Sequence, residues 1–204
     1  HYHYEDPAHP TLLTGLSVAG QGVAGQGAKP QRISTYAYDI QGRGILSVKG
    51  EPKRLGKDGK PVPGTGIEQV TLDFGAPGKT VLTNSLGQTT TYTHAIVGNE
   101  HRLLKVVGAG CASCGEANIR YGYDKLGHLT EVTKLGPSGQ PLSATRTERD
   151  ALGRITRVSR LIYHNAQAQP ARLQVRYAYQ GDSDRPSLIA RPSVIPGKEA
   201  VTRI

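Results

Sequence analysis

Cys111 and Cys114 are the pair of residues in this chain whose types and spacing suggest site chemistry. Two thiolates separated by two residues can share a zinc ion or close a small disulfide. A structural zinc ion needs two further ligands, and His94 and His101 can supply them if a hairpin brings them round. The sequence therefore leaves open a zinc site, a disulfide between Cys111 and Cys114, and two reduced thiols.

Catalytic roles are harder to support. A redox cysteine pair needs a helix N-terminus to stabilise its thiolate, whereas the glycines around Cys111 predict a loop. The stretch Gly20-Gln-Gly22-Val-Ala-Gly25 matches a dinucleotide-binding pattern, but those glycines must open a helix and here Pro30 and a strand-like stretch follow. Neither Gly-x-Ser-x-Gly nor His-Glu-x-x-His occurs. The sequence predicts no cofactor and no enzymatic activity.

A short pattern recurs along the chain: Tyr-x-Tyr-Asp-x-x-Gly in its full form and Asx-x-x-Gly in its weaker form. The repeated residues are Tyr36, Tyr38, Asp39, Gly42 and Arg43, then Asn84 and Gly87, then Tyr121, Tyr123, Asp124 and Gly127, and finally Asp150, Gly153 and Arg154. A further start is visible at Tyr177-Ala-Tyr179. Recurrence of this kind indicates an array of structural units in place of a single active site.

Each part of the pattern has a physical role in a β-hairpin. Tyr-x-Tyr places two rings on one face of a strand, where they can stack between neighbouring strands, since side chains alternate. Aspartate opens a turn by accepting backbone N–H groups, and glycine takes a positive φ. Arg43 and Arg154 can close their turns onto carbonyls or the aspartates. Apolar residues then recur three apart, as at Ile45 and Val48, which indicates either a sheet partly covered on both faces or a bulge in each hairpin, and we favour the bulge.

The composition agrees with an all-β fold of repeated antiparallel β-hairpins. The chain has 26 glycines and 13 prolines between short runs rich in threonine, valine, isoleucine and tyrosine, and it has no helical stripe. The sequence predicts a single repeat region over residues 1–204, with Gly- and Pro-rich loops at 17–31 and 50–66. The absence of methionine predicts that the chain is a piece of a longer protein.

The chain is basic, with 25 Lys and Arg, 16 Asp and Glu, and a formal net charge of +9. These cations are scattered and form no recognisable nucleic-acid module, so the sequence predicts no specific nucleic-acid binding. If a basic face lines a cavity, it could hold an acidic cargo, with Arg154, Arg157 and Arg160 as the residues to test. No apolar run is long enough for a membrane span.

The Tyr-Asp repeats with x-x-Gly-Arg turns resemble those of the bacterial Rhs (rearrangement hot spot), or YD-repeat, family. Three other stretches are similar to the same family: residues 1–15, with an aromatic pair before a Pro-Ala-His-Pro turn, residues 185–197, and the insert Gly110-Cys-Ala-Ser-Cys-Gly115. The resemblance covers essentially the whole chain. The family's self-cleaving segment, which is Asp-Pro-x-Gly-Leu-like, is not matched, because Asp6-Pro7 is followed by Ala-His.

The resemblance implies that the chain is an arc of a large spiral β-sheet shell that encloses a toxic C-terminal domain. Its partners would be neighbouring repeats, the enclosed toxin domain and secretion machinery, and its location would be secreted or on the surface of a bacterium. The repeat residues would then be structural. The alternative is a cell-surface module that binds carbohydrate or a partner through its exposed tyrosines.

Overall fold

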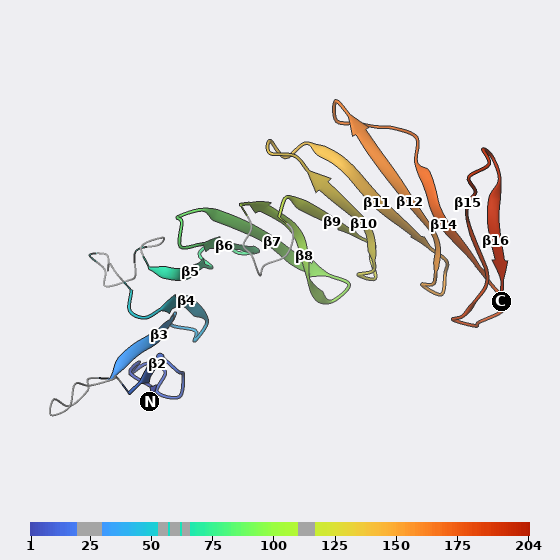
Figure 1. Cartoon of the computed structure of the whole chain (residues 1–204). Helices are drawn as coiled ribbons and strands as arrows, with labels where there is room; N and C mark the ends of the chain where they lie inside the picture. Colours follow the sequence, from blue (N-terminus) through green and yellow to red (C-terminus); the bar gives the residue numbers. More distant parts are fainter. Residues whose placement is uncertain (20–29, 53–56, 58–61, 63–65, 110–116) are drawn as a thin grey trace. The chain divides into compact units, whose positions relative to one another are not determined.

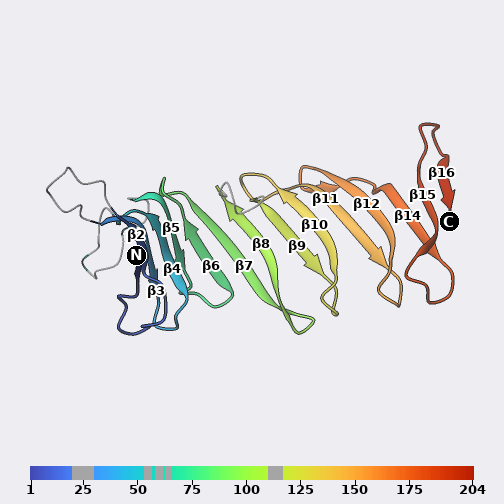
Figure 2. The ribbon, with the colours of Figure 1, turned by 60° about the horizontal axis from the view of Figure 1, so that its bottom comes forward.

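The computed structural model describes residues 1–19, 30–52, 57, 62, 66–109 and 117–204. Within these ranges all regular structure is β, in sixteen strands and without a helix. Strands pair antiparallel in chain order from β1 to β16, and the order of the labelled strands can be followed in Figures 1 and 2. Strand β13 lies off this path and pairs with β12. The predicted fold class, all-β with repeated antiparallel hairpins, is confirmed. Among the described residues, no helix meets the length and hydropathy needed to cross a bilayer.

Contacts divide the chain into two compact units, of which unit 1 comprises His1–Tyr92 with Gly108–Gly115. Its strands follow each other as hairpins and meanders along the chain. They are β1 (Tyr2–His3), β2 (Gly15–Val18), β3 (Gln31–Tyr38), β4 (Gly44–Lys49), β5 (Ile67–Asp73), β6 (Lys79–Thr83) and the beginning of β7 (Thr89–Val97). Leu46, Val48 and Leu82 form the buried apolar part of this unit.

Unit 2 comprises Thr93–Val107 with Glu116–Ile204. It contains the rest of β7 and the remaining strands. They are β8 (Glu100–Gly108), β9 (Ile119–Tyr123), β10 (Leu129–Leu135), β11 (Pro141–Arg149), β12 (Ile155–His164), β13 (Gln167–Ala168), β14 (Arg172–Tyr179), β15 (Pro186–Pro192) and β16 (Glu199–Arg203). Its buried side chains include small and polar ones, such as Ala144, Ala190, Thr133 and Ser159, so the apolar core is thin.

The predicted loops are partly described. Strands extend into the 17–31 loop from both ends, because Ser17 pairs with Arg32 and Val18 with Gln31. Residues 20–29 lie outside the described residues. In the 50–66 loop, Gly50, Glu51, Pro52, Lys57, Val62 and Gly66 are described, and none of them belongs to a strand. The expectation of one continuous repeat region over residues 1–204 stays a prediction.

The predicted bulges are present in the Tyr-Asp hairpins. In the first hairpin Ala37 pairs with Leu46 and Tyr38 with Gly44, so Ile45 is the extra residue. Thr130 and Thr156 take the same place after the later turns, because the register shifts by one residue there. A bulge bends its strand and increases the local twist. Each hairpin therefore carries the same irregularity at the same distance from its turn.

Candidate functional site: the hairpin turns and their tyrosine contacts

The turn at residues 150–154 shows the backbone geometry of the repeat. The Gly153 N–H donates to the Asp150 carbonyl and the Asp150 N–H donates to the Arg154 carbonyl, both at 3.0 Å. Gly153 has a φ of +80°, which costs a glycine little and an L-residue more. This is a type I turn followed by a left-handed residue, a common hairpin loop. The same two bonds, at 2.9–3.1 Å, close the turns at 39–43, 84–88 and 124–128.

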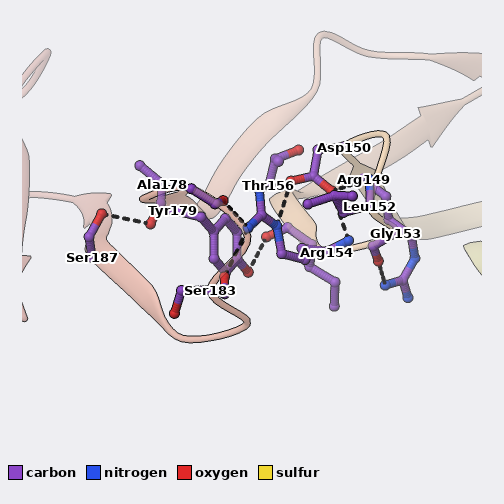
Figure 3. A network of polar contacts seen from close by, with 12 residues as sticks. Arg149, Asp150, Leu152, Gly153, Arg154, Thr156, Ala178, Tyr179, Ser183 and Ser187 are labelled. Carbon is purple, nitrogen blue, oxygen red and sulfur yellow. Dashed lines mark hydrogen bonds and ion pairs between the residues drawn. The ribbon is translucent and has the colours of Figure 1, made fainter.

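The side-chain oxygen of the Asx residue accepts backbone N–H groups inside each of these turns. Asp150 Oδ1 accepts the backbone N–H of Leu152 at 3.0 Å and that of Arg154 at 2.9 Å (Figure 3). Asp39, Asn84 and Asp124 accept the corresponding two N–H groups at 2.9–3.0 Å. These N–H groups have no strand partner inside the loop, so the side-chain oxygen satisfies them. In these four turns the Asx side chain therefore accepts the loop N–H groups that the backbone leaves without a partner.

The residue after the glycine closes the turn with its side chain. Arg154 Nε donates to Asp150 Oδ2 at 2.8 Å, and Arg43 Nε donates to Asp39 Oδ2 at 2.6 Å. In the third aspartate turn, His128 Nδ1 lies 3.0 Å from Asp124 Oδ2. In the asparagine turn the Asx side chain is the donor, because Asn84 Nδ2 donates to the side-chain oxygen Oε1 of Gln88 at 3.0 Å.

These contacts stabilise the ionised form of the turn aspartates. Burial opposes the ionised form of Asp150, but hydrogen bonds from the Arg154 guanidinium and backbone outweigh it and hold the pKa of this carboxyl below its ordinary value. The same balance lowers the pKa of Asp39 and that of Asp124, with Arg43 and His128 as the donors. The three aspartates are ionised at neutral pH, as acceptors of several N–H groups should be.

In three Tyr-x-Tyr pairs, the hydroxyl of the second tyrosine connects its strand to an earlier segment of the chain. Tyr179, the second tyrosine of its Tyr-x-Tyr pair, donates to the Ile155 carbonyl at 2.8 Å (Figure 3). Tyr38 donates to the Leu13 carbonyl at 2.7 Å, and Tyr123 donates to the Leu103 carbonyl at 2.9 Å. The acceptors lie 20–25 residues earlier in the chain. The hydroxyl thus bonds one hairpin to its predecessor.

Arginines add a second connection between successive hairpins. Arg154 lies with its guanidinium carbon 4.5 Å from the centroid of the Tyr179 ring, and its NH1 group donates to the carbonyls of Gly181 and Ser183 at 2.7 and 2.9 Å. In unit 1 the corresponding Arg43 lies 4.4 Å from the centroid of the Phe74 ring. Such cation–π contacts each contribute about 0.5–1 kcal/mol at exposed positions. One arginine therefore closes its own turn and holds the next one.

The tyrosines do not contact each other as the sequence suggests. Within the described residues no tyrosine ring stacks on another tyrosine ring, and the first tyrosine of each pair makes no hydrogen bond through its hydroxyl. The physical reason is the position of the second ring, whose hydroxyl reaches a carbonyl and which in Tyr123 and Tyr179 also lies against an arginine. In the predicted motif, Tyr36 and Tyr121 are therefore separate in role from Tyr38 and Tyr123.

The candidate zinc ligands are described only in part. Cys111 and Cys114 lie outside the described residues, so both the zinc site and the disulfide stay predictions. His94 and His101 lie together, with ring centroids 6.2 Å apart and an edge-on arrangement. In the part of the chain that the structure describes, no group of three His, Cys, Asp or Glu side chains has the geometry of a metal site.

Sequence reasoning missed a fifth turn of the same backbone type at residues 136–140. The Gly139 N–H donates to the Gly136 carbonyl at 2.9 Å, and the Gly136 N–H donates to the Gln140 carbonyl at 2.8 Å. Gln140 Oε1 accepts the backbone N–H of Ser138 at 3.1 Å, in place of an Asx oxygen. No Asx residue opens it, but Pro137 after Gly136 and the glycine at 139 are signals that could have revealed this turn.

A serine, a histidine and a carboxylate meet in unit 1 in the order of a catalytic triad. His3 Nε2 lies 2.7 Å from Ser17 Oγ, and His3 Nδ1 lies 3.0 Å from Glu5 Oε1. Ser17 is only 6% exposed, and Arg32 NH1 lies 3.0 Å from Glu5 Oε2. Hydrogen bonding to Arg32 also lowers the pKa of Glu5. A buried serine, together with a carboxylate that is ion-paired with an arginine, is typical of a structural network. Here the His3–Ser17 contact holds β1 against β2.

Comparisons with known proteins identify no family. No family model matches the chain, and no curated protein matches it. Among solved structures, a porin-like protein from Bacteroides uniformis is similar over 88% of this chain and 91% of its own, with 12% sequence identity and a TM-score of 0.32. At this TM-score the likeness supports no statement about the function of the chain.

Proposed function

We propose that this chain is a non-catalytic structural segment of an Rhs-type toxin shell, which encapsulates and helps deliver a C-terminal toxic domain. The observation that supports the proposal is the recurrence of one turn, with the same backbone and Asx hydrogen bonds, at 39–43, 84–88, 124–128 and 150–154. A wall built of repeats needs this feature, because each unit must present the same contacts to the next.

The contacts between hairpins are suited to a wall. Backbone hydrogen bonds are satisfied laterally by the neighbouring strand, so a repeated sheet does not need a thick packed core on each side. The tyrosine hydroxyls and turn arginines add side-chain contacts between successive hairpins. In such arrays stability comes largely from the interfaces between neighbours. The partners are then the neighbouring repeats, the enclosed toxic domain and the secretion machinery, and the location is secreted or on the bacterial surface.

The experiment is a structure of the full-length protein that carries residues 1–204, combined with protease digestion. The proposal expects the hairpins to pair around a cavity that holds a separate domain, and this domain should resist protease until the wall is broken. A matched pair of triple Tyr-to-Phe variants tests the wall. The hydroxyl-bonded tyrosines are Tyr38, Tyr123 and Tyr179, and the control tyrosines are Tyr36, Tyr121 and Tyr177. A protein without an enclosed domain would refute the proposal.

A second candidate function is a cell-surface module that binds carbohydrate or a partner. It is favoured by a concavity of about 700 Å³ in unit 1, whose lining includes Tyr38, Arg43, Leu72 and Phe74. Ligand sites combine such an apolar lining with a few polar groups. A glycan array with the chain and its Phe74→Ala variant separates the two functions. A specific hit that is lost in the variant would support the binding module, whereas the shell function expects no specific hit.

A further inference from the structure

The glutamates of the strands β10–β16 lie on one face of the sheet. In an antiparallel pair, residues directly opposite each other share a face. Glu131 lies opposite Arg146, and Glu148 lies opposite Arg157. Arg146 and Glu148 are two residues apart on β11, so both pairs are on the same face. Glu131 Oε2 accepts from the Arg146 guanidinium at 2.8 Å, so these charges neutralise each other.

Glu199 completes this set, and its partner is again an arginine. Arg176 lies opposite Arg157, which places it on the same face, and its guanidinium donates to Glu199 Oε2 at 2.6 Å. Hydrogen bonding to Arg176 lowers the pKa of Glu199. This face therefore contains every glutamate of β10–β16, together with the arginines that pair with them. We call it the mixed-charge face.

The opposite face has cations and no strand carboxylate. Arg160 is three residues from Arg157 on β12, so it points to the other side, and it lies directly opposite Arg172 on β14. Arg191 follows Ala190, which pairs with Arg176 of the mixed-charge face, so Arg191 also belongs to the other side. Strands β12, β14 and β15 lie side by side (Figure 2). We call the side with Arg160, Arg172 and Arg191 the basic face.

The cations of the basic face are exposed and held by no acid in the described chain. Arg160, Arg172 and Arg191 are all exposed. Within residues 117–204, ion-pair contacts are made by other arginines and by His128. Like charges directly opposite across two strands are destabilising. The Arg160–Arg172 pair therefore lowers the stability of the fold, and an anion that bridges the two guanidinium groups would remove this repulsion.

The chemistry around this pair favours a protein surface as the anion. Val158 and Val175 face each other beside the two arginines, and Ile162 next to them is 39% exposed. Alternating apolar and arginine side chains suit a partner that presents both carboxylates and apolar groups, since arginine forms planar two-bond contacts with carboxylate. Single-stranded nucleic acid binds along a continuous basic groove with successive stacking aromatics, whereas these arginines alternate with valine and isoleucine side chains.

We propose that the basic face of β12, β14 and β15 is a docking surface for an acidic protein surface, with carboxylates bridging Arg160 and Arg172. This inference does not depend on the shell function. It also separates the three arginines that the sequence grouped together. Arg157 belongs to the mixed-charge face, and Arg154 is committed to its turn. Of these three arginines, Arg160 is the one that lies on the basic face.

The test measures binding of poly-L-glutamate to the whole chain at 50 and 300 mM salt, with double-stranded DNA, heparin and phosphatidylglycerol vesicles as competing probes. The test variant is Arg160→Gln/Arg172→Gln. The control, Arg157→Gln/Arg203→Gln, removes the same charge from the other face. We expect polyglutamate binding to weaken roughly tenfold in the test variant and less than about twofold in the control, and to weaken with salt.

The thermal midpoint of unfolding of each variant separates a loss of binding from a loss of folded protein. Removing the like-charged Arg160–Arg172 pair should leave the thermal midpoint unchanged or raise it, so weaker binding is not explained by unfolding. Equal losses of binding in both double variants would show attraction to net charge alone and would overturn the proposal. So would absence of polyglutamate binding, or tighter binding of DNA, heparin or vesicles that depends on the same two arginines.

Discussion

Replacing Tyr179 by phenylalanine removes one hydroxyl and tests whether the tyrosine contact stabilises the array. The hydroxyl donates to the Ile155 carbonyl at 2.8 Å across two neighbouring strands. The ring itself should stay in place, because the chain already contains a phenylalanine in the same relation to a turn arginine. The Arg43–Phe74 distance is 4.4 Å and the Arg154–Tyr179 distance is 4.5 Å.

The expected loss follows from one hydrogen bond. A typical intramolecular hydrogen bond contributes about 1 kcal/mol net, and the Ile155 carbonyl loses its side-chain donor in the variant. Tyr179→Phe should therefore lower the free energy of unfolding by about 1 kcal/mol, which corresponds to a fall in Tm of about 3 °C for a chain of this size. Tyr179→Ala also removes the half-buried ring and its contact with Arg154, so we expect a loss of about 3 kcal/mol.

The measurement is urea unfolding followed by circular dichroism, with Tyr177→Phe as the matched control. Tyr177 lies on the same strand and its hydroxyl makes no hydrogen bond in the described part of the chain. Its variant should change the free energy of unfolding by less than about 0.5 kcal/mol. If both phenylalanine variants lose the same amount, the hydroxyl contact does not stabilise the array and the reasoning is wrong.

Three further predictions concern the turns and the mixed-charge face. Hydrogen bonds keep the pKa of the turn aspartates below their ordinary value, so their stabilisation is complete above about pH 4 and is lost as acid carries the pH through the lowered values, which unfolding at stepwise lower pH would show. Gly98→Ala should cost at least about 2 kcal/mol more than Gly87→Ala in the same urea assay, because both have positive φ but only at Gly98 would a Cβ clash with the Leu126 backbone. Equal losses would leave only the backbone conformation as the cause. Glu131→Gln should cost about 1 kcal/mol through its charge-assisted bonds to Arg146, and an unchanged unfolding midpoint at moderate salt would contradict this.

Much of the fold could be predicted because its signals are local. Asp39, Asp124 and Asp150, each followed by glycine three residues later, mark the turns, since the carboxylate accepts the loop N–H groups and glycine takes the left-handed position at little cost. The turn at 136–140 was not recognised because Gln140 provides the accepting oxygen from the far end. Its backbone is the same, but the local signal is different.

Contacts between repeats could not be predicted from local patterns. Nothing in Tyr-x-Tyr indicates that the second hydroxyl bonds to a carbonyl 20–25 residues earlier, because this depends on strand order and register. The unequal faces of β10–β16 have the same origin. Arg157 and Arg160 look alike along the sequence, yet one lies among glutamates and the other opposite Arg172.

The sequence by itself determined the all-β class and the position of the repeated Asx turns, because hydrogen bonds within five residues and side-chain alternation along a strand depend only on neighbours in the chain. The tertiary structure decided which side chains meet across strands. A shift of one residue in register moves each side chain to the opposite face, so the pairing of Arg154 with Tyr179 and of Arg160 with Arg172 exists only once the strands are aligned.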